Sequence, residues 1–239
     1  MFKIVFITFG GPTENYHNAV KRICKEASDF ELFNEVYGYT EKDLQQNAQF
    51  WEKHGQFITN NQRGYGYWIW KSYLIQKKLE ELNYGDFLIY ADAGCKINKN
   101  GKQRFFEYID ILNNDINQYG ILSFQMLHLE KMYTKTAIFN WFNVDDNIIN
   151  SGQCIGGIQI LKKTDHSVNI INKWVENMNY NLINDNIQNE KNYFIENRHD
   201  QSIYSVIVKK YGSIKIPDET WFNDWNDGNN IPILAKRNK

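Results

Sequence analysis

Residues 86–95 constrain the fold of this chain more than any other segment. They read Asp-Phe-Leu-Ile-Tyr-Ala-Asp-Ala-Gly-Cys, so an apolar run ends abruptly at Asp92. A strand that is apolar on both faces belongs inside a parallel sheet, and such sheets bind ligands outside the carboxyl ends of their strands. The pattern therefore predicts that Asp92 belongs to a binding site. The structural alternative is an acid at a strand end that only caps the next turn.

The preceding segment, residues 63–71, combines aromatic rings with two cations. It reads Arg-Gly-Tyr-Gly-Tyr-Trp-Ile-Trp-Lys. A guanidinium group offers a planar fork to phosphate oxygens, and an ammonium group offers a point charge. Aromatic faces stack on sugars and bases, although they also fill cores. Arg63 and Lys71 are therefore candidate ligands for a diphosphate.

Strand and helix patterns alternate along the chain, beginning with the order strand, helix, strand, helix. Thr40 and Asp43 have the spacing of a capping box, which predicts a helix start. Strands are predicted at 3–8, 32–37, 86–90, 120–126, 156–161 and 213–216, and residues 127–155 read as irregular. This order predicts an α/β fold with a mixed, mostly parallel central sheet and helices on both faces. We expect one domain over residues 1–228 and a polar tail over 229–239.

Composition excludes several classes of protein. The 239 residues are 42% hydrophobic and 23% charged, which suits a globular core. A net charge of −1 without a basic stripe argues against a nucleic-acid partner, and no apolar stretch reaches the ~18 residues of a membrane span. Cys24, Cys95 and Cys154 form neither a disulfide framework nor a zinc motif. We therefore expect a cytoplasmic protein with reduced thiols.

Five parts of the sequence together resemble a known family. They are the N-terminal strand, the aromatic segment, Ile-Tyr-Ala-Asp-Ala-Gly at 89–94, Gly156-Gly157 and Asp200-Gln201. They are similar to nucleotide-sugar glycosyltransferases of the GT-A fold, especially galactosyltransferase-like and family-8-like enzymes of bacteria and large DNA viruses. The resemblance runs over roughly residues 3–216. It implies a GT-A-like (Rossmann-like) fold. It also implies transfer of a sugar from a nucleotide-sugar donor, such as a UDP-sugar, to a hydroxyl of a glycan, glycoprotein or small molecule.

The resemblance also implies a metal and a donor site. The family's Asp-x-Asp motif holds Mn²⁺ or Mg²⁺, which bridges the donor phosphates and offsets charge on the departing diphosphate. The first Asp maps to Asp92, the expected metal ligand, but the second maps to Gly94. His199, Asp224 and Asp227 remain open as further ligands. The expected donor-binding residues are Thr8, Phe9, Gly10, Arg63, Lys71, Asp92, Ala93, Gly94, Gly156 and Gly157.

Asp200 and Gln201 are the expected catalytic residues. In family-8-like enzymes an Asp-Gln pair at a helix start faces the reacting carbon of the sugar. An oxygen there can stabilise an oxocarbenium-like centre. Helix capping is the alternative role for Asp200, and Gln153 is a further candidate for binding a sugar hydroxyl.

Two other functions remain open. A sugar nucleotidyltransferase would show a basic, Gly-rich loop after the first strand. Gly10 and Gly11 are present, but no Lys or Arg follows before Lys21, which counts against this function. A non-catalytic sugar- or nucleotide-binding module is the other alternative, and Gly94 in place of an acid is its main support.

Overall fold

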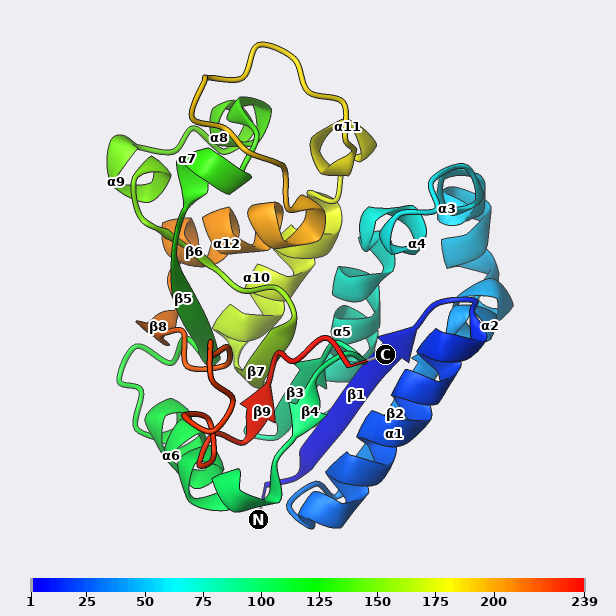
Figure 1. Ribbon diagram of the computed structural model, residues 1–239, viewed down its shortest axis with the longest axis vertical. Helices are drawn as coiled ribbons and strands as arrows, with labels where there is room; N and C mark the ends of the chain where they lie inside the picture. The colour runs from blue at the N-terminus through cyan, green and yellow to red at the C-terminus, as the bar shows by residue number, and fades with distance from the viewer. Residues whose placement is uncertain (1, 239) are drawn as a thin grey trace.

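A mixed sheet of seven strands forms the centre of the computed structural model, which describes residues 2–238 (Figure 1). The strands are β1 (Ile4–Gly10), β2 (Glu35–Thr40), β3 (Phe87–Ala91), β5 (Ile121–Leu129), β6 (Gly152–Cys154), β7 (Ile158–Lys162) and β8 (Ile214–Pro217). Their order is β2-β1-β3-β7-β5-β6, and β8 pairs with β5. β7 and β6 run antiparallel to the other five strands. The mixed, mostly parallel sheet confirms the predicted fold class.

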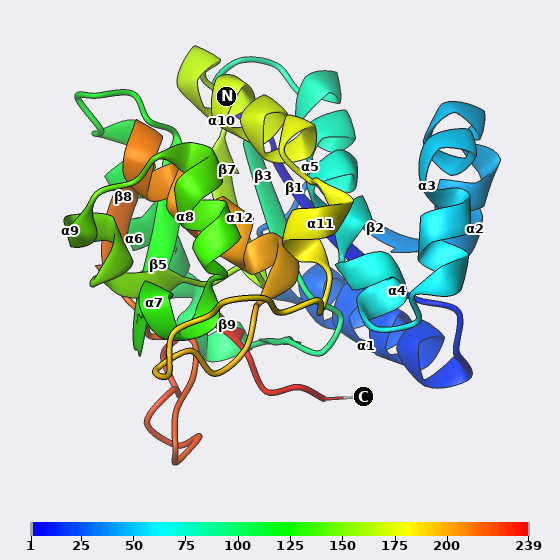
Figure 2. The ribbon, with the colours of Figure 1, turned by 90° about the horizontal axis from the view of Figure 1, so that it is seen from above.

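Helices cover both faces of this sheet (Figures 1 and 2). One face packs against α5 (Ile69–Glu81), α10 (Asp165–Glu176) and α12 (His199–Tyr211). The opposite face packs against α1 (Glu14–Phe30) and α6 (Lys102–Asn113). The remaining helices are α2 (Glu41–Gln46), α3 (Ala48–Asn60), α4 (Gly64–Tyr67), α7 (Glu130–Tyr133), α8 (Thr136–Phe142), α9 (Asp146–Ile149) and α11 (Tyr180–Ile183), with a 3₁₀ turn at Lys99–Gly101. Within residues 2–238, no helix combines the length and apolar character that crossing a membrane requires.

The alternation of side chains along β3 decides which face carries the site. Leu88 and Tyr90 belong to the core shared with α5, α10 and α12, whereas Phe87 and Ile89 belong to the core on the opposite face. Successive side chains of a strand point to opposite faces, so residue 92 continues the row of Tyr90. The strand therefore directs Asp92 toward α5 and α12.

The helix start predicted at Thr40 and Asp43 is confirmed. Thr40 and Asp43 form a capping box at α2, in which the Thr40 backbone N–H donates to Asp43 Oδ2 over 2.7 Å. Thr164 caps α10 through its side chain. Gly212 follows the last residue of α12 with a φ of 111°, a backbone conformation that favours glycine.

The structure corrects the prediction that residues 127–155 are irregular. This stretch contains the end of β5, the short helices α7 to α9, and β6. Each of the three helices has seven residues or fewer, too few for an apolar period to be visible in the sequence.

The predicted polar tail also differs from the structure over residues 229–238; Lys239 lies outside the described residues. Ile233 and Leu234 form β9 (Ile233–Leu234), which pairs antiparallel with β4 (Lys96–Ile97) and is buried. Two apolar residues anchor the segment, although its composition is mostly polar. In the view of Figure 1, the red C-terminal trace runs from β9 across the front of the sheet.

Candidate active site

Asp92 follows β3 directly and exposes its carboxylate. The Tyr90 hydroxyl donates to Asp92 Oδ1 over 2.5 Å, and the Asp92 backbone N–H donates to the Gly157 carbonyl over 2.8 Å. The Asp92 side chain remains 39% exposed. A carboxylate that is fixed on one side and open to solvent on the other can receive a ligand.

Lys71 lies beneath this carboxylate and joins it to Asp200. Its Nζ is 3.2 Å from Asp92 Oδ1 and 3.0 Å from Asp200 Oδ2, and the Lys71 side chain is only 3% exposed. Burial disfavours the ammonium, but the charges of Asp200 and Asp92 outweigh it and raise the pKa of Lys71. Lys71 is therefore a buried counter-ion of two carboxylates, and the structure does not expose it to a phosphate.

Asp200, the second residue of α12, is the buried member of this cluster. Its side chain is 5% exposed. Burial raises the pKa of Asp200 to about 6, a shift that Lys71 opposes and Asp92 increases. Helix capping does not explain the residue, because the N-cap of α12 is Arg198. At neutral pH Asp200 is ionised and paired with Lys71.

Gly156 and Gly157 pass between Gln201 and Asp92 at short range. A Cβ atom on Gly156 would lie 2.8 Å from Gln201 Cβ, and one on Gly157 would lie 2.8 Å from Asp92 Oδ2. Gln201 Oε1 accepts from the Gly156 N–H over 2.8 Å, and Gln201 Nε2 donates to Gln153 Oε1 over 2.6 Å. Both glycines are required by close approach. The Gln201 amide is used to hold the backbone beside Asp92.

Two groups that support this cluster, Tyr90 and Glu130, were not predicted from the sequence. Tyr90 could have been found, because it stands two positions before Asp92 on the same strand face. Glu130 is fully buried and bonds Lys209 over 2.8 Å and Thr134 over 2.6 Å. Glu130 also accepts from Gln153 Nε2 over 3.2 Å, so the buried Gln153 is not free for a sugar hydroxyl. No pattern in the sequence marks Glu130.

The aromatic segment forms a left-handed turn. Five consecutive residues have φ values between 52° and 85°: Gly64, Tyr65, Gly66, Tyr67 and Trp68. This conformation costs roughly 1–2 kcal/mol for each residue that carries a Cβ. The carbonyl of Gly64 accepts two hydrogen bonds, one from the backbone N–H of Trp68 over 3.1 Å and one from the indole Nε1–H of Trp70 over 3.0 Å. Backbone strain of this kind clusters at functional sites.

His199 stacks on this turn, with ring centroids 5.3 Å from Trp68 and 5.0 Å from Tyr67. Its Nδ1 lies 2.6 Å from the Ile183 carbonyl oxygen, and burial lowers the pKa of His199. The stacking ties the strained turn to the start of α12, immediately before Asp200.

Arg63 lies outside the carboxylate cluster. Its guanidinium bonds Asp185 over 3.0 Å and lies 3.5 Å from Glu196. Both acids belong to the loop before α12, so Arg63 connects that loop to α4. The structure therefore does not bring the predicted phosphate ligands Arg63 and Lys71 together.

Thr8, Phe9 and Gly10, at the end of β1, were expected to contact the donor, but each of them packs closely against other parts of the protein. Thr8 is buried and donates its hydroxyl to the Ala91 carbonyl over 2.7 Å. Phe9 packs on Trp70 with ring centroids 3.9 Å apart. A Cβ atom on Gly10 would lie 2.6 Å from Val20 Cγ2, so contact with α1 accounts for that glycine.

Of the metal-ligating side chains expected at this site, only Asp92 is placed to bind a divalent cation. Gly94 supplies no carboxylate, and Asp200 is committed to Lys71. Among residues 2–238, no group of three or more His, Cys, Asp and Glu side chains could hold a metal, and the proposed completing ligands His199, Asp224 and Asp227 do not form one with Asp92. One carboxylate still suits Mg²⁺, which commonly takes one or two carboxylates and completes its sphere with substrate phosphates and water.

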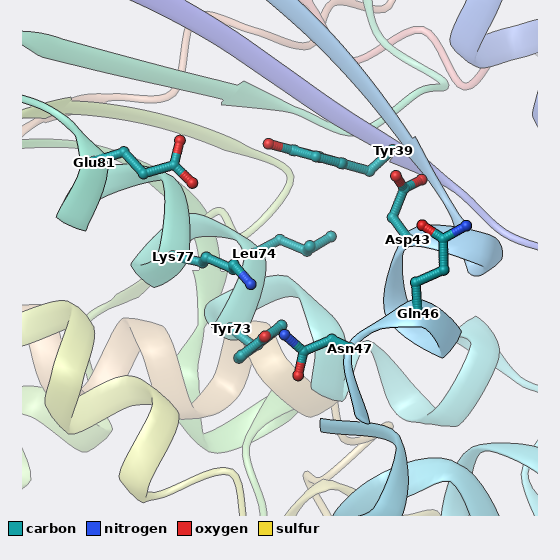
Figure 3. Close-up of a pocket in the computed structure, with 8 residues that line it drawn as sticks. All are labelled: Tyr39, Asp43, Gln46, Asn47, Tyr73, Leu74, Lys77 and Glu81. Carbon is teal, nitrogen blue, oxygen red and sulfur yellow. The ribbon is translucent and has the colours of Figure 1, made fainter. Parts of the chain in front are cut away.

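A cavity of about 190 Å³ lies elsewhere, between α5 and the segment from β2 to α2 (Figure 3). Tyr39 and Tyr73 flank it, and the polar ends of Asp43, Lys77 and Glu81 surround it. It shares no lining residue with the carboxylate cluster. We therefore place the candidate site by its charges and not by cavity shape.

The chain matches no protein-family model and no curated protein. It is similar in structure to a glycosyltransferase involved in the glycosylation of the major capsid of PBCV-1, with a TM-score of 0.54, 12% identity, and coverage of 97% of this chain and 91% of that chain. It is also similar to mouse xyloside xylosyltransferase 1 in its apo form, with a TM-score of 0.50, 10% identity, and coverage of 98% and 97%. At these identities the similarity is one of fold, so the chain has the mixed α/β fold of these two glycosyltransferases.

Proposed function

We propose that this protein is a glycosyltransferase of the GT-A type. It transfers a sugar from a nucleotide-sugar donor, which we take to be a UDP-sugar, to a hydroxyl of a carbohydrate or glycoprotein. The observation that carries the proposal is the buried Lys71 ammonium between two carboxylates, with Asp92 exposed at the end of a central strand. Its setting in a fold shared with two glycosyltransferases supports it. The free cysteines support a cytoplasmic location.

Asp92 is the residue of the cluster that would touch the donor, because its carboxylate alone is substantially exposed. Lys71 holds Asp92 Oδ1, and Asp200 balances the charge of Lys71 from below. Asp200 is thus a positioning residue in this proposal, although the resemblance implies direct catalysis. Gln201 positions the Gly156 backbone in the same way. A preorganised polar set of this kind needs no rearrangement while charge develops in the transition state.

Mg²⁺ or Mn²⁺ would be held by Asp92 through its exposed carboxylate. When bound, the ion would offset the negative charge on the leaving diphosphate. Gly156 and Gly157 let the backbone approach Gln201 and Asp92 closely, which would keep the Asp92 carboxylate in position for the donor. The remaining positive charge at the phosphates has to come from the protein.

Calorimetry with UDP, GDP and CDP, each with and without Mn²⁺ or Mg²⁺, tests the proposal. We expect UDP to bind in the micromolar to millimolar range and to bind more tightly with metal. Asp92→Ala should fold normally and weaken UDP binding tenfold or more, which is about 1.4 kcal/mol. Absence of nucleotide binding in the wild type would refute the function. Binding without release of UDP from any UDP-sugar and acceptor would favour the non-catalytic module.

A further inference from the structure

The cavity beside α5 is separate from the carboxylate cluster. It has a volume of about 190 Å³ and lies between α5 and the segment from β2 to α2 (Figure 3). Lys71 and Tyr73 are two residues apart on α5, a spacing that rotates side chains by about 200° around a helix axis. Lys71 points to Asp92 and Asp200, whereas Tyr73 lines the cavity from the other side of the helix. A ligand in this cavity would therefore bind apart from Asp92.

Two tyrosine rings flank the cavity, and each is held by a ring that does not line it. Tyr73 stacks on Phe50, with centroids 4.5 Å apart and an angle of 29° between the planes. Tyr39 stacks on Tyr37, with centroids 6.2 Å apart and an angle of 6°. Leu74 adds an apolar surface between the two flanking rings (Figure 3). Rings that are already fixed lose little entropy when a ligand packs on them.

Two carboxylates in the lining are also held by one oxygen each. Asp43 Oδ2 accepts from the Thr40 backbone N–H over 2.7 Å, and Glu81 Oε2 accepts from Lys78 Nζ over 2.5 Å. Within residues 2–238, the second oxygen of each carboxylate accepts no hydrogen bond, and the Gln46 amide forms none. The cavity thus presents fixed acceptors, together with an amide that can both donate and accept.

The charge and size of the cavity restrict its ligand. Asp43 and Glu81 oppose a single ammonium in the lining, that of Lys77, so a phosphate would be repelled. The volume is below the ~300–1,000 Å³ of pockets that take drug-sized ligands, which argues against a nucleotide. A sugar ring offers an apolar face to a tyrosine and several hydroxyl groups to carboxylate and amide oxygens. A small neutral polyol fits this lining best.

We propose that this cavity binds one neutral sugar ring, either a free sugar or the end residue of a glycan. Tyr73 stacks on the apolar face of the ring, and Asp43, Glu81 and Gln46 hydrogen-bond its hydroxyl groups. The lining itself identifies this class of ligand, so the assignment does not depend on the nucleotide donor proposed above. Because the cavity shares no residue with the carboxylate cluster, a sugar here and a nucleotide at Asp92 can bind together.

NMR titration of the full-length, isotope-labelled protein with glucose, galactose, mannose, xylose, maltose, lactose and xylobiose tests the site. We expect at least one of these sugars to shift the amide signals of the lining residues. A preference for a disaccharide identifies a glycan end, and equal binding of its monosaccharide identifies a free sugar. Gln46→Ala should weaken the binding about fivefold by removing a hydrogen bond. Tyr73→Ala should weaken it about tenfold, whereas Tyr73→Phe keeps the ring and most of the affinity.

Gln45→Ala is the matched control. Gln45 is the neighbouring exposed glutamine on α2 and does not line the cavity; its Nε2 lies 3.5 Å from the Tyr65 hydroxyl. Its loss should leave sugar affinity within about twofold. Gln46 is also exposed, so Gln46→Ala tests the site even if Tyr73→Ala does not fold. UDP affinity should be the same in all four variants.

The two proposals fail separately. The inference is overturned if no sugar of the panel shifts the signals of the lining residues, or if Gln46→Ala and Gln45→Ala bind the sugar equally well. Either result leaves the proposed function intact, because UDP binding at Asp92 is measured independently. A wild type that binds a sugar in the cavity, but no nucleotide, would refute the proposed function and retain this site.

Discussion

Replacing Lys71 by methionine removes a positive charge and keeps most of the side-chain volume. In the wild type, Lys71 Nζ lies 3.0 Å from Asp200 Oδ2 and 3.2 Å from Asp92 Oδ1. At an effective dielectric constant of about 20, opposite charges at 3 Å attract by about 5.5 kcal/mol. Desolvation of both partners offsets part of this attraction. Asp200 is left buried without a counter-ion in the variant.

Breaking a buried pair from one side typically destabilises a protein by about 3–5 kcal/mol. For a chain of this size, that loss should lower Tm by about 10 °C. The double variant, Lys71→Met/Asp200→Asn, removes both buried charges. Its free energy of unfolding should exceed that of Lys71→Met by at least ~2 kcal/mol. UDP binding should remain impaired in both variants, because Asp92 Oδ1 loses the ammonium that positions it.

Urea and thermal unfolding at pH 7.5, followed by circular dichroism, measure these differences. Lys77→Met is the matched control, since Lys77 lies on the same helix but is exposed. It should change stability by no more than about 0.5 kcal/mol. Two results would refute the reasoning: a Lys71 variant as stable as the control, or a double variant no more stable than the single one.

Three further predictions concern neighbouring residues. Because the pKa of Asp200 is about 6, we expect donor turnover to decline as pH falls through 6; a pH–rate profile should lose this limb in Asp200→Asn. The pKa of Asp200 is higher in the folded protein than in the unfolded chain, where it is near 3.8. The contribution of this carboxyl to the free energy of unfolding is therefore present at low pH and is lost as pH rises from about 4 to about 6. Gly157→Ala should weaken UDP binding at least tenfold, measured by calorimetry, because its Cβ would lie 2.8 Å from Asp92 Oδ2. Asp43→Ala should cost about 1 kcal/mol in urea unfolding by removing the capping box with Thr40, and unchanged stability would contradict it.

Local features of the fold followed from short patterns in the sequence. The apolar runs of β1 and β3 identified buried parallel strands, and the Thr40 capping box identified the start of α2. Each of these signals depends on neighbours within a few residues, because side-chain period and backbone caps are local properties. The helices of residues 130–149 escaped prediction because each is about one or two turns long.

The sequence alone determined that Asp92 ends a central strand and that Asp200 begins a helix. Only the tertiary structure decided that Lys71 lies between them, that Arg63 is paired with Asp185 instead, and that the C-terminus covers Gly94. Contacts between distant segments depend on how helices pack on the sheet and on which turn of a helix meets which strand. No spacing along the chain records that geometry. The sequence thus determined the fold class and the exposed carboxylate, whereas packing selected the charges that surround it.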